Sequence, residues 1–124
     1  MRPLKNTAQF HWTNHVQQKM LFYRISEGRI KRVIANPKRR DNGVAPNTVA
    51  LMQRNDTLKR KEEIWVMVAA ENKVSRIENR VLGQKGKTIV ISAWRYPGIS
   101  KPGKEIPMPE GLIEEILSSF ADLA

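Results

Sequence analysis

Apolar residues recur along the chain with two spacings, one typical of helices and one typical of strands. Helical spacing links Val16, Met20 and Tyr23 and, further on, Ile30, Val33 and Ile34. Thr13 and Ser26 stand directly before these two groups, where a side-chain oxygen can accept a hydrogen bond from a free backbone N–H. The pattern therefore predicts two consecutive helices. The first runs from Thr13 to Arg24, and the second ends at Asn36 because Pro37 disfavours helical geometry in the residue before it.

Segments rich in β-branched and aromatic residues predict the strands. These are Thr48–Arg54, Ile64–Val68 and Thr88–Arg95, and the short aromatic run Phe10–Trp12 could add an edge strand. Residues 64–68 are apolar at consecutive positions, which is typical of a central strand covered on both faces. Residues 38–43 predict a charged loop with a turn signal. Residues 71–87 fit a short helix and a projecting hairpin equally well.

The C-terminal segment predicts a third helix, amphipathic and acidic, over residues 109–123. Its apolar stripe consists of Leu112, Ile113, Ile116, Leu117 and Phe120. The expected fold class is α+β: two N-terminal helices packed on a twisted antiparallel sheet of three to four strands, with a C-terminal amphipathic helix. We expect one domain over residues 1–124 with its core at residues 8–98. The terminal helix could cover the second face of the sheet or lie over the basic surface.

Charge narrows the class of partner. The 124 residues include 22 Lys and Arg against 12 Asp and Glu, a net charge of +10. Residues 1–104 hold all the cations and seven anions, whereas residues 105–124 hold five anions and no cation. Such a surface attracts polyanions, and nucleic acid, with RNA as the leading expectation, is favoured over an anionic membrane because no basic amphipathic helix with a broad apolar face is present. The alternatives are that the charge serves solubility alone, or that DNA is bound.

Several chemistries are excluded by what the sequence lacks. Without cysteine there is no disulfide and no thiolate metal site, which fits a reducing, cytoplasmic location. No apolar run approaches the roughly 20 residues of a membrane span, and the N-terminus shows no secretory signal. His11 and His15 are four residues apart, yet no H-E-x-x-H motif or carboxylate cluster supplies further metal ligands. We expect neither a metal nor another cofactor.

Metal-free acid–base chemistry on RNA remains open to this chain. It needs a base for the 2′-hydroxyl, an acid for the leaving oxygen and cations for the phosphate. His15 at a helix N-terminus is a candidate for the general base, and Lys19 lies one turn further on. The His15 side chain could equally cap the helix or pack at its start. Strict alternation places Arg95 on the face of Ile89, Ile91 and Ala93, opposite Trp94. Arg95 is then either a buried ion-pair partner or an exposed phosphate ligand.

These considerations give two sets of candidate residues. The catalytic candidates are His15, Lys19, Arg95 and Tyr96. The RNA-binding candidates are Arg54 and Trp94 at strand ends and the loop cations Lys38, Arg39, Arg40, Lys59, Arg60 and Lys61. A loop cation can equally be a solvated charge without a ligand.

The N-terminal third resembles a known family. The run from Thr13 to Met20, then Arg24-Ile25-Ser26, then Ile30, Val33, Ile34 and Asn36-Pro37 resembles the T-x-H-A-x-x-R-M, R-G-I-S, I-x-x-V-I-x-N-P opening of a small uncharacterised bacterial domain family, itself similar to the RelE and BrnT toxins. The resemblance covers residues 13–37. Val16 replaces the usual Ala, and the usual Gly before Ile25 is missing.

The resemblance implies a RelE-like fold and a toxin that cleaves messenger RNA without a metal, often on the ribosome. His15 would then be an active-site or helix-anchoring residue, Arg95 would stabilise phosphate charge, and an acidic antitoxin would be a partner. The alternatives are a non-catalytic basic RNA-binding or ribosome-associated protein, and a module whose acidic helix docks another protein.

Overall fold

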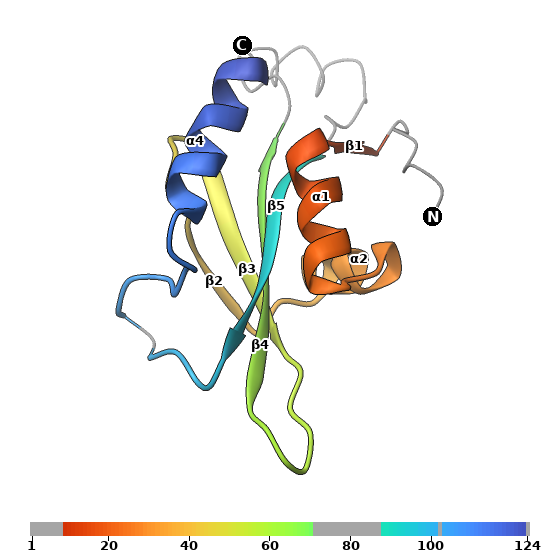
Figure 1. Cartoon of the computed structure of the whole chain (residues 1–124), viewed down its shortest axis with the longest axis vertical. Helices are drawn as coiled ribbons and strands as arrows, with labels where there is room; N and C mark the ends of the chain where they lie inside the picture. Colours follow the sequence, from red (N-terminus) through yellow and green to blue (C-terminus); the bar gives the residue numbers. More distant parts are fainter. Residues whose placement is uncertain (1–8, 71–87, 102, 124) are drawn as a thin grey trace, which may run out of the picture.

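A five-stranded sheet lies between two N-terminal helices on one face and a C-terminal helix on the other (Figure 1). The computed structural model describes residues 9–70, 88–101 and 103–123. The elements follow the chain as β1 (Phe10–Trp12), α1 (Asn14–Tyr23), α2 (Glu27–Ala35), β2 (Arg39–Asn42), β3 (Thr48–Arg54), β4 (Glu62–Ala70), β5 (Thr88–Pro97) and α4 (Leu112–Leu123). The predicted α+β class is confirmed, with both N-terminal helices and the terminal helix.

The sheet differs from the expected one in size and direction. Its strand order is β1-β5-β4-β3-β2, so it has five strands rather than three or four. Neighbouring strands are antiparallel except β1, which runs parallel to β5. The charged loop expected at residues 38–43 contains β2, which pairs with β3 from Arg39↔Met52 to Asn42↔Val49. Its four polar residues lack an alternating apolar pattern, and the ladder to β3 holds them instead.

Both predicted helix caps are confirmed. The Thr13 hydroxyl accepts a hydrogen bond from the N–H of Val16 at 3.0 Å, and the Ser26 hydroxyl accepts one from Arg29 at 3.1 Å. The Thr13 Oγ1 also lies 3.0 Å from the carbonyl oxygen of Ile91, which fixes the start of α1 to β5. Arg24 ends α1 in the left-handed region at φ 56°.

Two apolar cores fill the faces of the sheet. The first lies under α1 and α2 and includes Val16, Met20, Ile30, Val33, Leu51, Ile64, Val66 and Val90. The second lies under α4 and includes Met52, Trp65, Met67, Ile91, Trp94, Leu112 and Ile116. The terminal helix therefore covers the second face of the sheet, one of the two positions expected. It begins at Leu112 rather than 109, and Ile113 and Leu117 of its predicted stripe are exposed.

A β-bulge in β5 changes which side chains share a face. Val68 pairs with Val90 and Met67 with Ser92, so Ile91 is the extra residue. Ile89 and Ile91 consequently pack in the second core together with Trp94, whereas Ala93 packs in the first. The prediction that Arg95 shares a face with Ile89 and Ile91 was wrong for this reason. Arg95 lies opposite Ile64, which packs in the first core with Ala93.

Residues 71–87, for which a helix and a hairpin were both open, lie outside the described residues. Within the described residues, no helix has the length and apolar character needed to span a membrane.

Candidate nucleic-acid interface

Two loops at one end of the sheet form a single surface, which we call the basic end. One is the β3–β4 loop, residues 55–61, and the other is the start of the β5–α4 connector, residues 98–104. The Gly98 N–H donates to the carbonyl oxygen of Lys61 at 2.9 Å. The Ser100 N–H donates to the carboxylate of Glu63 at 2.9 Å. These bonds hold the connector against the hairpin.

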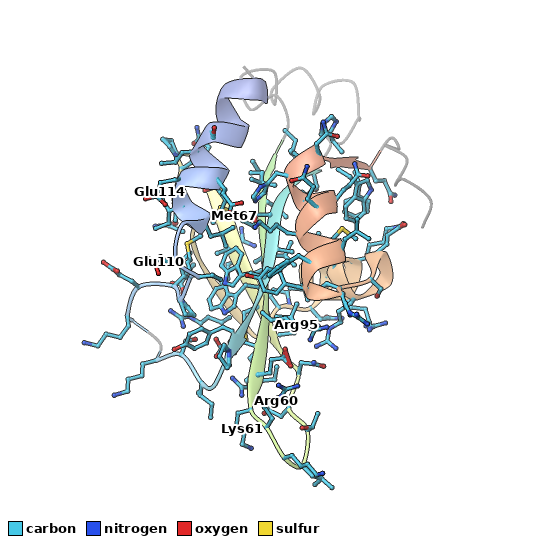
Figure 2. All side chains as sticks on the ribbon, in the orientation of Figure 1. Arg60, Lys61, Met67, Arg95, Glu110 and Glu114 are labelled. Atoms are coloured by element: carbon cyan, nitrogen blue, oxygen red, sulfur yellow. The ribbon has the colours of Figure 1, made fainter. Side chains whose placement is uncertain are left out.

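The outer layer of the basic end carries unpaired positive charge. Its five exposed cations are Lys59, Arg60, Lys61, Lys101 and Lys104, and none of them forms an ion pair with a described carboxylate. Figure 2 shows Arg60 and Lys61 on the hairpin that projects at the lower end, while Glu110 and Glu114 lie near the start of α4, well away from it. The exposed Glu105 borders the surface on the connector side.

Beneath these cations lies a carboxylate whose acceptor positions are filled. Glu63 is fully buried. It accepts hydrogen bonds at 2.9 Å from Nη1 of Arg54, from the Trp65 indole N–H, and from both the backbone N–H and the hydroxyl of Ser100. Burial of a carboxylate is tolerated only with such compensation. Glu63 therefore joins β3, β4 and the connector.

Arg54 and Asp56 extend this inner layer into the hairpin. The second arm of the Arg54 guanidinium donates to Asp56 Oδ1 at 2.5 Å. The hydrogen bond from Arg54, followed by one from the Glu62 N–H, lowers the pKa of Asp56. The same contact raises the pKa of Arg54. Arg54, a predicted RNA-binding residue, is thus committed to two carboxylates.

Arg39 ties β2 to the connector. Its Nε donates to Asp41 at 2.5 Å, its Nη1 to the Ser100 hydroxyl at 2.7 Å and its Nη2 to the carbonyl oxygen of Lys104 at 3.0 Å. The guanidinium also lies over the ring of Trp65, 5.2 Å from its centroid. Its side chain is only 9% exposed. This arrangement is structural and leaves little of Arg39 for an RNA phosphate.

Trp94 cannot stack on a base as predicted. Its side chain is fully buried, its ring is stacked on Trp65 with centroids 6.0 Å apart, and its N–H donates to the carbonyl oxygen of Pro107 at 2.7 Å. The physical reason is that α4 and the connector cover this face of the sheet, so Trp94 packs beneath them. Tyr96 is half-buried and packs on the same core, opposite Glu63 in the ladder. Lys38 and Arg40 are exposed at β2, the edge strand.

His15 and Lys19 lie in a different place, which we call the α1–α4 seam, where these helices approach each other beside β5. His15 Nε2 is 2.9 Å from the Ser92 hydroxyl, and Lys19 Nζ is 3.0 Å from Glu115 of α4. Burial, and next the positive charge of Lys19, lowers the pKa of His15, while Glu115 opposes them. The neutral imidazole is therefore favoured near pH 7.

Arg95 is not part of this seam. It donates from Nε to the carbonyl oxygen of Tyr23 at 2.6 Å, from Nη2 to that of Arg24 at 3.0 Å and from Nη1 to Glu62 at 2.9 Å. It thereby caps the C-terminal end of α1. His15 stands at the other end of that helix, about 12 Å away along its axis. The structure brings His15 and Lys19 near each other and leaves Arg95 and Tyr96 elsewhere.

The sequence analysis missed four residues that now define the two regions. Ser92 stands within an apolar strand, and Glu63 precedes Trp65 and Met67 at the two-residue spacing of side chains that share one face of a strand. Both positions could therefore have been predicted to be buried. Lys101 and Lys104 were not among the candidates, because nothing in the local sequence sets them apart from other loop cations. No group of histidine, aspartate and glutamate among the described residues could hold a metal ion.

Comparison of the chain with known protein families, with curated proteins and with solved structures found no match. The resemblance to the RelE and BrnT toxins therefore stays a prediction, carried by residues 13–37 alone.

Proposed function

We propose that this chain is an RNA-binding protein that holds phosphate groups of RNA against the basic end. One observation carries the proposal: the carboxylates Asp56, Glu62 and Glu63 beneath this surface are each bound by arginine, and none of the exposed cations above them forms an ion pair with a described carboxylate. Exposed lysine and arginine side chains without an ion-pair partner are the groups that contact nucleic-acid phosphates.

RNA is favoured over DNA by the shape of the surface. The described part of the basic end consists of a tight hairpin and an irregular connector, without a helix that could enter the major groove of DNA. Loops with lysine and arginine suit the irregular backbone of folded or single-stranded RNA.

A salt series with a charge-matched pair of variants tests this proposal. Arg60→Gln/Lys61→Gln removes two cations of the basic end, and Lys31→Gln/Arg32→Gln removes two exposed cations of α2. Fluorescence anisotropy with a labelled single-stranded RNA gives the dissociation constant at each salt concentration. Each lost contact to a single-stranded phosphate reduces the magnitude of the slope of log K against log salt by about 0.7. For Arg60→Gln/Lys61→Gln we therefore expect a slope smaller by about 1.4 and RNA binding about tenfold weaker.

The control decides whether the site or the total charge matters. We expect Lys31→Gln/Arg32→Gln to bind nearly as the unmodified protein does. Equal losses in both variants would show attraction by net charge without a defined surface. Absence of RNA binding by the unmodified protein at low salt would refute the proposal outright.

A second candidate function is the metal-independent endoribonuclease implied by the RelE resemblance. The observation that favours it is the lowered pKa of His15, because a general base must be neutral at working pH. In this case His15 would take the 2′-hydroxyl proton beside Lys19, and an acidic antitoxin would be a partner. Arg95 would contribute by holding α1, since its N–H groups already have acceptors.

Cleavage in the presence of a chelator tests this second candidate. Long RNA is incubated with the protein, with and without translating ribosomes, and compared with His15→Gln after circular dichroism has shown that the variant is folded. Product that forms in chelator and disappears with His15→Gln would support a ribonuclease. RNA that stays intact in every condition, yet is retarded in a gel, would leave RNA binding as the function.

A further inference from the structure

Leu58 stands at the tip of the β3–β4 loop without packing on the protein. Its relative exposure is 107%, which means that the whole side chain is accessible. The other large apolar side chains described as exposed reach at most 74%, the value of Phe22. A leucine in this position contributes no burial free energy to the fold, so its apolar surface remains available to a ligand.

The loop that carries Leu58 is held in one conformation. At the tip, the Thr57 N–H donates to the carbonyl oxygen of Arg60 at 2.8 Å, and the Thr57 hydroxyl accepts from the Arg60 N–H at 3.1 Å. Lower down, the Asn55 N–H donates to the carbonyl oxygen of Glu62 at 2.9 Å, and Asp56 accepts from the Glu62 N–H at 2.9 Å. The chain therefore presents Leu58 on a preorganised turn.

The stem of the hairpin is also fixed to the body of the protein. Arg29 of α2 donates to the Asn55 side chain at 3.1 Å and to the carbonyl oxygen of Arg54 at 2.8 Å. Arg54 in turn reaches the buried Glu63. These bonds fix the tip of the hairpin relative to the sheet. A loop that is already fixed in this way loses little conformational entropy when it binds a ligand.

We propose that Leu58 is a wedge that inserts beside an unpaired base of a folded RNA, while Lys59, Arg60 and Lys61 contact the flanking phosphates. This inference rests on the proposed RNA binding and adds the class of RNA. Apolar side chains between cations are used in this way to part stacked bases. Bulges and loops are the favoured targets, because an unpaired base is already partly unstacked and its faces are open.

The test compares two RNA hairpins that differ by one bulged nucleotide. The fluorescent base 2-aminopurine next to the bulge reports unstacking, and the same base stands at the matching position of the fully paired hairpin. The unmodified protein is expected to bind the bulged RNA more tightly and to raise its fluorescence. Leu58→Ala is expected to bind the bulged RNA about tenfold more weakly, with the fluorescence rise lost and the salt slope unchanged.

Controls separate the wedge from the charge and from the fold. Leu58 makes no packing contact, so the melting temperature of Leu58→Ala should equal that of the unmodified protein. Ile99→Ala removes another exposed apolar side chain of the basic end, 65% exposed, and should leave the preference for the bulge intact. Arg60→Gln/Lys61→Gln should lower the affinity for the bulged and for the paired RNA by the same factor.

The outcomes distinguish this inference from the function on which it rests. If Leu58→Ala binds the bulged RNA as tightly as the unmodified protein, the wedge is refuted while RNA binding stands. The same holds if paired and bulged RNA bind alike. If neither RNA binds, both proposals fall. Binding to vesicles of phosphatidylcholine and phosphatidylserine that is lost in Leu58→Ala, without discrimination between the RNAs, would assign Leu58 to a membrane surface instead.

Discussion

The basic end and the α1–α4 seam both gather ionisable residues around β5, but they use their charges differently. In the seam, His15 has Ser92 and Lys19 has Glu115, so each group has a partner within the chain. At the basic end only the inner layer is paired, through Arg54 and Arg95, and the outer lysines are not. The seam therefore joins two helices through its charges, whereas the outer cations of the basic end form no ion pair with a described carboxylate.

The difference lies in where a cation stands in the chain. Arg39, Arg54 and Arg95 stand in strands, where carboxylates of β2, β4 and the β3–β4 loop and carbonyl oxygens of α1 and the connector accept from the fixed fork of each guanidinium. Lys59, Lys101 and Lys104 stand in loops, and none of them forms an ion pair with a described carboxylate. Removing a strand cation should cost stability, and removing a loop cation should cost ligand binding.

The largest expected effect concerns Glu63. Glu63→Gln leaves the Arg54 charge without its buried partner and places an amide donor among other donors. We expect a loss of about 3 kcal/mol in the free energy of unfolding. Urea unfolding measures it, with the exposed Glu105→Gln as the matched control, expected within about 0.5 kcal/mol of the unmodified protein. A loss below about 1 kcal/mol would mean that the inner layer is dispensable.

Arg95→Met is expected to have the second largest effect, and it distinguishes a structural role of Arg95 from a role in binding phosphate. It removes the donors to Tyr23 and Arg24 at the end of α1 and leaves Glu62 without its ion pair. We expect a loss of about 2 kcal/mol in unfolding free energy. RNA affinity should not change, because this guanidinium does not belong to the outer layer. Arg32→Met on the exposed side of α2 is the control. A folded Arg95→Met variant with unaltered stability but weakened RNA binding would return Arg95 to the role of phosphate ligand.

Local patterns in the sequence predicted much of the fold and little of this division of charge. The caps at Thr13 and Ser26 and the strand Thr48–Arg54 follow from hydrogen-bonding chemistry and periodicity within a few residues. The bulge at Ile91 does not, because the pairing of β4 with β5 produces it. It places Ile89 and Ile91 on the face of the sheet opposite to Arg95.

Which cations are paired depends on contacts between distant segments. Arg54 and Glu63 are nine residues apart, while Arg95 meets Glu62 across 33 residues and Tyr23 across 72. No local pattern distinguishes these arginines from Arg60. The candidate list therefore combined structural cations with free ones, and it omitted Leu58, whose isolation in the polar segment 55–61 was the available signal.

The seam should respond to pH through His15. The groups that face it are Ser92, Lys19 and Glu115, and its pKa in the folded protein lies below the ordinary value of 6.5. As pH falls, the unfolded chain therefore takes up the proton first. The contribution of the neutral imidazole is complete above that ordinary value and declines as pH falls toward the folded pKa.

Urea midpoints of the unmodified protein and of His15→Gln, measured at about pH 7.5 and about pH 5.5, isolate this contribution. The unmodified protein should lose more stability between the two pH values than the variant does, by less than the effect of Arg95→Met. An equal loss in both proteins would show that His15 is not the titrating group. RNA affinity at the basic end should not follow this titration.

The smallest expected effect is that of the ion pair between Lys19 and Glu115, whose side chains are 17% and 48% exposed. Solvent screens a pair of this kind, so a double-mutant cycle of Lys19→Met and Glu115→Gln should give a coupling of about 0.5 kcal/mol, falling with added salt. The ion pair between Lys31 and Glu27 within α2 supplies the reference cycle, since both of its partners are exposed. A coupling well above about 1 kcal/mol would make the seam an electrostatic clamp comparable to the Glu63 network. A coupling near zero would mean that apolar packing of Leu112 and Ile116 holds α4 against the sheet, and that the ion pair between Lys19 and Glu115 adds no stability.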